Sequence, residues 1–105
     1  MRKSAGKTAK FGEIDHQKWC SFLRGLHPQR TAACVAADLG APVRTVENWL
    51  AGNARPNLFW FARALSAYGP EMLEASMIDP PGWLVEARRR AQRAQLERQL
   101  AELDD

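Results

Sequence analysis

The side chains of this chain best suited to chemistry are polar residues at helical spacing between positions 43 and 51. Arg44 and Asn48 are four residues apart, so in a helix they project from the same side. A guanidinium fork matches the O6 and N7 acceptors of guanine, and a carboxamide matches N6 and N7 of adenine. This pair predicts contacts with the edges of DNA bases, and the plain alternative is a solvated helix face.

Two neighbours extend the same face. Val43 offers a methyl contact for thymine, and Glu47 offers an acceptor for the N4 amine of cytosine. Glu47 has a second interpretation, in which it orients Arg44 or repels the wrong bases. We therefore take Val43, Arg44, Glu47 and Asn48 as the candidate base-reading residues.

These residues need a rigid support, and residues 31–56 predict one. The segment reads as two short helices joined at Gly40, which supplies the left-handed backbone that ends a helix without a Cβ clash. Ala36 provides the small side chain that two closely crossing helices need. The apolar positions recur at helical spacing; they are Val35, Ala36, Leu39, Val43, Val46, Trp49 and Leu50. This is the sequence logic of a DNA-binding helix-turn-helix.

The segment resembles the Cro/lambda-repressor-like (XRE-type) helix-turn-helix family in two respects. The first is the spacing of Ala36, Gly40, Val46 and Trp49, and the second is the ending W-x-x-G-x-x-x-P, which closes at Pro56. The resemblance covers about residues 13–78. It implies that the helix containing Arg44 enters the major groove, with the residues near its amino end at the bases. One departure is Pro42, where such domains often place Ser, Thr or Asn.

Backbone phosphates are expected to be held at the helix ends and flanks. Thr31 and the free N–H groups of its helix suit one strand, and Arg30 is a further candidate. The resemblance implies that Thr45, Asn53 and Arg55 grip the backbone on either side of the recognition helix. Asn53 alternatively stabilises the turn after Gly52.

The rest of the chain predicts an all-α fold: a five-helix lambda-repressor-like domain with an appended C-terminal helix. Asp15 is expected to cap a first helix to about residue 26, and Thr31 to cap the second. The third runs from about 43 to 51, the fourth from 58 to 68 behind a cap at Asn57, and the fifth from 71 to 77. Phe61 is expected in the core with Leu58, Ala62 and Leu65. No strand pattern appears.

Residues 79–82, Asp-Pro-Pro-Gly, interrupt the helical pattern, and a strongly helical composition follows from 83 to 103. This final segment, 79–105, is too polar to form a core alone and needs a partner. Arg88, Arg89 and Arg90 diverge by about 100° each, so they read as a solvated face.

A single recognition helix reads only a few base pairs, so a specific site favours two copies about 34 Å apart on an inverted repeat. Three consecutive aromatics, residues 59–61, cannot all face one small core. We expect a homodimer interface from the fourth and fifth helices and the C-terminal helix, at Phe59, Trp60, Trp83, Leu96 and Leu100. The alternative is that the aromatics clamp the last helix onto a monomer.

Charge is concentrated at the amino end, where residues 1–10 hold four cationic residues and no acid. Residues 1–12 therefore read as a flexible phosphate-binding arm or as a solvated leader. Cys20 and Cys34 are expected as small buried hydrophobes, and no ligand spacing supports a zinc site with His16 or His27. No apolar run reaches membrane-spanning length, and no cofactor is expected. We expect a cytoplasmic protein.

The leading interpretation is a small sequence-specific regulator of transcription, most simply a phage-like repressor that binds double-stranded DNA as a homodimer. The alternative is an antitoxin that binds operator DNA and masks a small toxin with its C-terminal helix. An enzyme is disfavoured, because no phosphate loop, metal cluster or nucleophile–base arrangement is visible.

Overall fold

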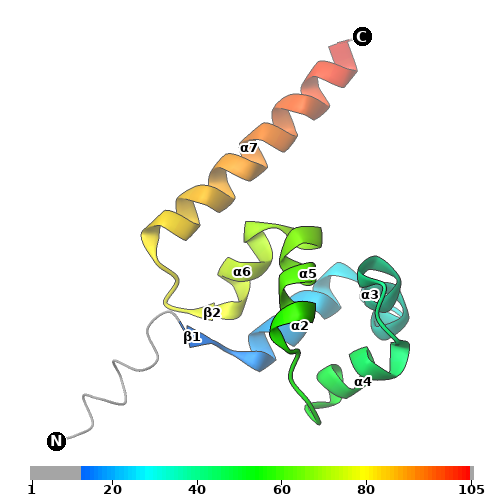
Figure 1. The fold of residues 1–105 in the computed structure, drawn as a ribbon. Helices are drawn as coiled ribbons and strands as arrows, with labels where there is room; N and C mark the ends of the chain where they lie inside the picture. The colour runs from blue at the N-terminus through cyan, green and yellow to red at the C-terminus, as the bar shows by residue number, and fades with distance from the viewer. Residues whose placement is uncertain (1–12, 105) are drawn as a thin grey trace, which may run out of the picture.

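The computed structural model describes residues 13–104 and is mostly helical in that range, in agreement with the all-α prediction (Figure 1). The elements are β1 (Glu13–Ile14), α2 (His16–Leu26), α3 (Thr31–Leu39), α4 (Val43–Ala51), α5 (Leu58–Tyr68), α6 (Pro70–Ser76), β2 (Met77–Ile78) and α7 (Gly82–Asp104). Helices α2 to α6 form one body, and α7 projects away from it (Figure 1).

The prediction that the chain contains no strand is wrong at two short segments. β1 pairs antiparallel with β2, with Glu13 opposite Ile78 and Ile14 opposite Met77. The N–H of Asp15 donates to the carbonyl oxygen of Ser76 at 2.8 Å and continues the ladder. Strands of two residues are too short to show alternation in a sequence. The ladder ties together the two ends of the segment from 13 to 78.

Several predicted helix ends are confirmed. Asp15 caps α2, because its carboxylate accepts from the N–H groups of the second and third residues that follow it. Asn57 caps α5 by accepting from the N–H of Trp60 at 3.0 Å. Gly40 and Gly52 follow α3 and α4 with φ of 72° and 81°, the left-handed conformation that glycine adopts without strain.

The prediction that Thr31 caps α3 is wrong. Thr31 is the first residue of the helix, and Arg30 occupies the cap position with a left-handed φ of 56° and no side-chain cap bond. The Thr31 hydroxyl instead donates to the carbonyl oxygen of His27. His27 precedes Pro28 and ends α2, so its carbonyl is available to the hydroxyl one turn later.

Trp19 lies at the centre of the core. Its ring centroid is 5.4 Å from that of Trp49 and 5.9 Å from that of Phe61, and its indole N–H donates to the sulfur of Met72 at 3.3 Å. The buried set is Trp19, Cys20, Leu23, Val35, Ala36, Leu39, Val46, Trp49, Ala64 and Met72. These residues come from α2 to α6, so every helix of the body contributes to one core.

The predicted core face of helix α5 is confirmed in part, because Phe61 and Leu65 pack against the core. Leu58, expected in the core, is 84% exposed, and Ala62 is exposed as well. The inward positions are Phe61, Ala64, Leu65 and Tyr68, which follow the i, i+3, i+4, i+7 spacing of a helix stripe. The physical reason is that α5 packs against α3 and α6, which turns its buried stripe toward Ala64 and Tyr68 and leaves Leu58 and Ala62 outside.

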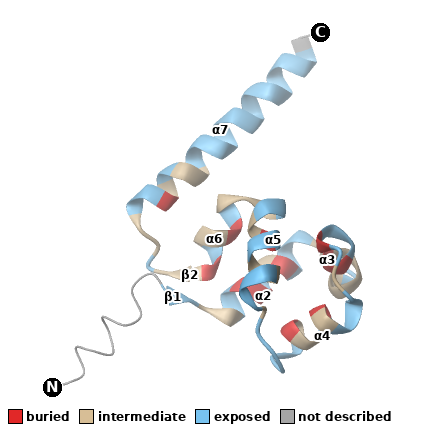
Figure 2. Ribbon diagram, viewed as in Figure 1, coloured by how far each residue is buried: buried red, intermediate tan, exposed pale blue. Residues whose placement is uncertain are grey.

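Helix α7 is anchored to α6 by its first turns. Leu84 is only 1% exposed, and the Arg88 guanidinium donates to the Glu74 carboxylate at 2.6 Å. The same helix carries a surface ion pair at i, i+4, in which Arg90 Nε lies 3.6 Å from Glu86 Oε2. From residue 89 to residue 103 every residue of α7 is exposed (Figure 2). Within residues 13–104, no helix combines the length and the apolar character needed to span a bilayer.

Candidate nucleic-acid interface

Helix α4 has two contrasting faces. Val46 and Trp49 are buried in the core, whereas Arg44 and Glu47 are exposed. Asn48 is half-buried at the edge of the polar face. Val43, the remaining base-reading candidate, is exposed at the start of the helix. The four candidates therefore remain accessible on one helix. Figure 1 places that helix at the edge of the body, away from α7.

A short corner sets the start of α4. Gly40 reverses the chain after α3, and the N–H of Ala41 donates to the carbonyl oxygen of Ala36 at 3.0 Å. Pro42 then occupies the cap position with extended backbone and no side-chain cap bond, and its carbonyl accepts from Thr45 and Val46. Proline at this position fixes φ near the helical value without offering a capping group. Helix α4 consequently begins at Val43.

Side chains from α2 hold the carboxyl end of α4. The Arg24 guanidinium donates to the carbonyl oxygen of Leu50 at 2.9 Å, and His16 Nε2 lies 2.8 Å from the carbonyl oxygen of Trp49. A carbonyl only accepts, so His16 carries a proton on Nε2 here. A cation near the last carbonyls also complements the helix dipole. These bonds fix α4 without using its outer face.

The carboxyl end of α3 is held by side chains of α5 and by His27, the residue that follows α2. Arg63 Nε donates to the carbonyl oxygen of Leu39, the last residue of α3, at 2.9 Å. The Asp38 carboxylate accepts from the Tyr68 hydroxyl at 2.7 Å and lies 2.9 Å from His27 Nε2. The pKa of Asp38 is lowered, mainly by the hydrogen bond from Tyr68 and secondly by the one from His27. Burial and the same bond raise the pKa of Tyr68.

Sequence reasoning did not identify Arg24, Asp38, Arg63 or Tyr68 as supports of the α3–α4 corner. Each of them acts on a residue 11 to 30 positions away. No local pattern carries such a contact, because helical spacing relates only residues within about two turns.

The phosphate candidates lie around this corner. Arg30 is exposed before α3, and Thr45 is half-buried in the first turn of α4. The hydroxyl of Thr31 donates to the carbonyl oxygen of His27. Asn53 and Arg55 are exposed in the segment after α4. These residues therefore lie at or close to the ends of α3 and α4.

The turn after α4 bears on the alternative role of Asn53. The carbonyl oxygen of Asn48 accepts from the backbone N–H groups of Asn53 and Ala54, at 2.9 and 3.3 Å. The backbone thus closes this turn, and the Asn53 side chain is exposed. This geometry leaves its carboxamide accessible to a partner.

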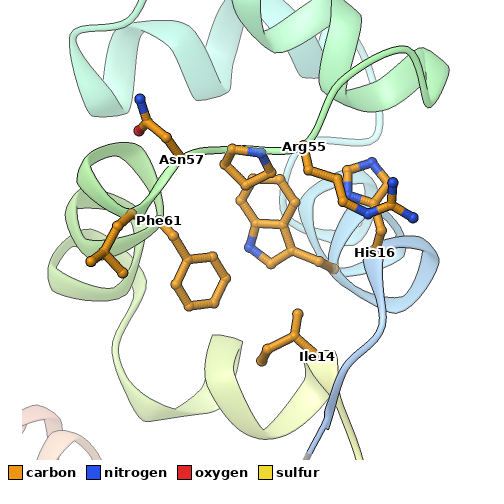
Figure 3. A pocket seen from close by; sticks show the side chains of 8 residues that line it. Ile14, His16, Arg55, Asn57 and Phe61 are labelled. Carbon is orange, nitrogen blue, oxygen red and sulfur yellow. The ribbon is translucent and has the colours of Figure 1, made fainter.

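An apolar pocket of about 290 Å³ lies beside the segment that follows α4 (Figure 3). His16 and Arg55 stand on one side of it and Phe61 on the other (Figure 3). The lining consists of Ile14, His16, Trp19, Arg55, Pro56, Asn57, Leu58 and Phe61. The pocket offers apolar contact with few polar groups.

Cys20 lies next to His16, one of the lining residues, with its Sγ 3.4 Å from His16 Nε2. Burial raises the pKa of the Cys20 thiol, although the Arg24 charge opposes this. The thiol therefore stays protonated at neutral pH and is not an activated nucleophile. Cys20 is buried as expected, whereas Cys34 is only half-buried. Among the described residues, His, Cys, Asp and Glu form no group of three that would bind a metal.

The residues expected in the homodimer interface lie on two separate helices, α5 and α7. Phe59 is exposed on α5, with the Arg63 guanidinium 5.6 Å from its ring centroid, and Trp60 is half-buried against Trp49. Trp83, Leu96 and Leu100 are exposed on α7, which packs mainly against α6. The structure does not clamp α7 onto the aromatics of α5.

Comparison of the chain with protein-family models, with curated proteins and with solved structures finds no match.

Proposed function

We propose that the chain is a sequence-specific DNA-binding regulator that inserts α4 into the major groove. One observation carries the proposal: α4 presents Arg44 and Glu47 to solvent while Val46 and Trp49 anchor its opposite face in the core. Bonds from α2 to its last carbonyls support it further, because a recognition helix must be held rigidly to discriminate between bases. In this proposal α3 and α4 form a helix-turn-helix of the XRE type.

Each polar residue has a role in this proposal. Arg44 pairs with guanine, Asn48 with adenine, and Val43 touches a thymine methyl. Glu47 accepts from cytosine; it forms no ion pair with Arg44 within residues 13–104, so orientation of Arg44 is the weaker reading. The side-chain phosphate contacts come from Arg30, Thr45, Asn53 and Arg55, and Thr31, whose hydroxyl is bonded to His27, contributes its backbone N–H at the start of α3.

The simplest regulatory role is repression by occlusion of a promoter in the cytoplasm. A homodimer would place two α4 helices on an inverted repeat, because half-sites one helical turn apart match a two-fold protein. The antitoxin alternative uses the same α4 for the operator and assigns α7 to a toxin. It predicts co-purification with a small basic protein encoded next to this chain.

Selection of bound fragments from random DNA duplexes tests the proposal. We expect a consensus with two-fold symmetry, measured by sequencing the bound pool at increasing salt. Absence of binding to any duplex in a low-salt anisotropy titration would refute it.

The substitution Arg44→Ala then tests the assignment of the base reader. We expect a loss of about 1–3 kcal/mol, confined to sequences with guanine at one position. The matched control is Arg98→Ala, which removes the same charge from the exposed part of α7. A loss that is equal for every sequence would make Arg44 a phosphate contact instead.

A further inference from the structure

Helix α7 carries an apolar stripe that its own body does not cover. Leu96, Leu100 and Leu103 are 59%, 61% and 81% exposed. They follow one another at i, i+4 and i+7, so they share one face, which we call the leucine stripe. Leu84, the residue that anchors α7 on α6, lies about 120° around the helix from Leu96 at 100° per residue. The stripe therefore points away from the anchoring contact.

The charges of α7 are divided between its two halves. Residues 88–93 contain four arginines and no acid, whereas residues 97–105 contain four acids and a single arginine, Arg98. Two such helices lying parallel would place arginines beside arginines and acids beside acids. Two antiparallel helices would place each basic half beside an acidic half, which is the arrangement that electrostatics favours.

We propose that α7 pairs antiparallel with α7 of a second copy of this chain, through the leucine stripe, with the two helices crossing near Leu96. Arg93 and Glu97 flank the stripe on the same side, about 60° and 100° from Leu96. With the two-fold axis at residue 96, position 93 of one helix lies opposite position 99 of the other, and Glu97 of that copy is two residues away, about 3 Å along the helix and within reach of Arg93. The inference rests on the dimeric part of the proposed function and is independent of DNA binding.

The crossing point sets the separation of the two bodies. Leu84 and Leu96 are twelve residues apart, so a crossing at Leu96 separates the two Leu84 anchors by about 36 Å along the helices. A single helix pair buries less than a standard interface of about 1,600 Å². We therefore expect dissociation constants in the micromolar range.

Sedimentation equilibrium of the full chain without DNA measures the pairing. We expect a mass that rises with concentration from 11.8 kDa to twice that value. The substitution Arg93→Glu is expected to raise the dissociation constant roughly tenfold, because it turns two attractions into repulsions. Glu97→Arg acts in the same direction. In the antiparallel arrangement the double variant restores opposite charges across the pair and is expected to recover pairing. Because positions 93 and 97 are also i, i+4 neighbours within one helix, the orientation itself is decided by the trapping experiment below.

A matched control separates this effect from net charge. Arg98→Glu makes the same charge change as Arg93→Glu, but its side chain lies about 160° from the leucine stripe. We expect the control to dimerise like the unsubstituted chain. A weakening of pairing in the control equal to that of Arg93→Glu would overturn the register. Failure of the double variant to recover would do the same.

Disulfide trapping determines the orientation. A mixture of Arg89→Cys chains with Leu103→Cys chains is expected to form the mixed dimer under mild oxidation, because positions 89 and 103 face each other across an axis at residue 96. The unsubstituted chain controls for Cys20 and Cys34. If Leu103→Cys instead cross-links efficiently to itself, the helices are parallel and the proposal is wrong.

The mass measurement also separates this inference from the proposed function. A chain that stays monomeric at hundreds of micromolar, whether or not it binds DNA, overturns the α7 pairing. A stable complex of monomeric chain with a small basic protein would assign the stripe to that partner and would overturn the pairing as well. A dimer that binds no duplex supports the pairing and refutes the proposed function.

Discussion

Arg63 on α5 donates from Nε to the carbonyl oxygen of Leu39, the last residue of α3, at 2.9 Å. Arg24 on α2 donates from a terminal guanidinium nitrogen to the carbonyl oxygen of Leu50 in α4. Each helix of the α3–α4 corner thus has its carboxyl end held by an arginine from another helix. Both contacts leave the outer face of α4 uncovered.

The first prediction concerns this support. Arg63→Ala is expected to lower the free energy of unfolding by about 1 kcal/mol, because it removes a charge-assisted bond that is partly exposed. Urea denaturation measures the change. Arg98→Ala, on the exposed part of α7, is the control and is expected within about 0.5 kcal/mol of the unsubstituted chain. Equal values for both variants would show that the Leu39 contact adds no stability.

The second prediction compares two glycines. Gly52 has φ of 81° and no atom within 4 Å of an added Cβ, so Gly52→Ala strains the backbone without a clash. We expect a loss of about 1 kcal/mol. Gly25 lies inside α2, with equally open surroundings. Gly25→Ala is expected to stabilise by about 0.5–1 kcal/mol. Thermal unfolding of the pair gives the sign of each effect, and a stabilising Gly52→Ala would contradict the assigned turn.

The third prediction concerns the anchor of α7. Leu84→Ala is expected to cost about 2–3 kcal/mol, since it removes a fully buried side chain. Leu58→Ala makes the same change at a side chain that is 84% exposed, and its effect is expected within about 0.5 kcal/mol. Hydrogen exchange by mass spectrometry should show faster exchange in α7 for Leu84→Ala alone. Unchanged exchange there would mean that Leu84 does not anchor the helix.

The fourth prediction is a pH dependence. The pKa of Asp38 is lowered in the folded state by Tyr68 and His27. Its stabilising contribution is therefore present above the ordinary Asp pKa of about 3.9 and is lost as the pH falls through the lower folded value. Tyr68→Phe removes the hydroxyl and is expected to cost about 1 kcal/mol at pH 7.

The difference between Tyr68→Phe and the unsubstituted chain should shrink as the pH falls below 4. Denaturation midpoints across pH 2–8 measure it. Asp38→Asn keeps an acceptor for Tyr68 but removes the titrating group, so its stability should vary less with pH in the acid range. A Tyr68→Phe difference that is constant from pH 8 to pH 2 would exclude the Asp38 contact as its source.

The sequence alone determined the helices and most of their ends. Asp15, Asn57, Gly40 and Gly52 act on backbone groups within one turn, so their residue types suffice to place a cap or a stop. The apolar spacing that predicted a buried inner face for α4 is also local, and Val46 and Trp49 are buried as expected.

Only the tertiary structure decided which distant groups meet. The β1–β2 ladder, the arginines on Leu39 and Leu50, and the outward position of Leu58 depend on how helices far apart in sequence pack. Thr31 is an example: its residue type suits a helix cap, but its hydroxyl donates a hydrogen bond to the carbonyl oxygen of His27 instead. Local chemistry defines what a residue can bind, and packing selects which of those partners lies within reach.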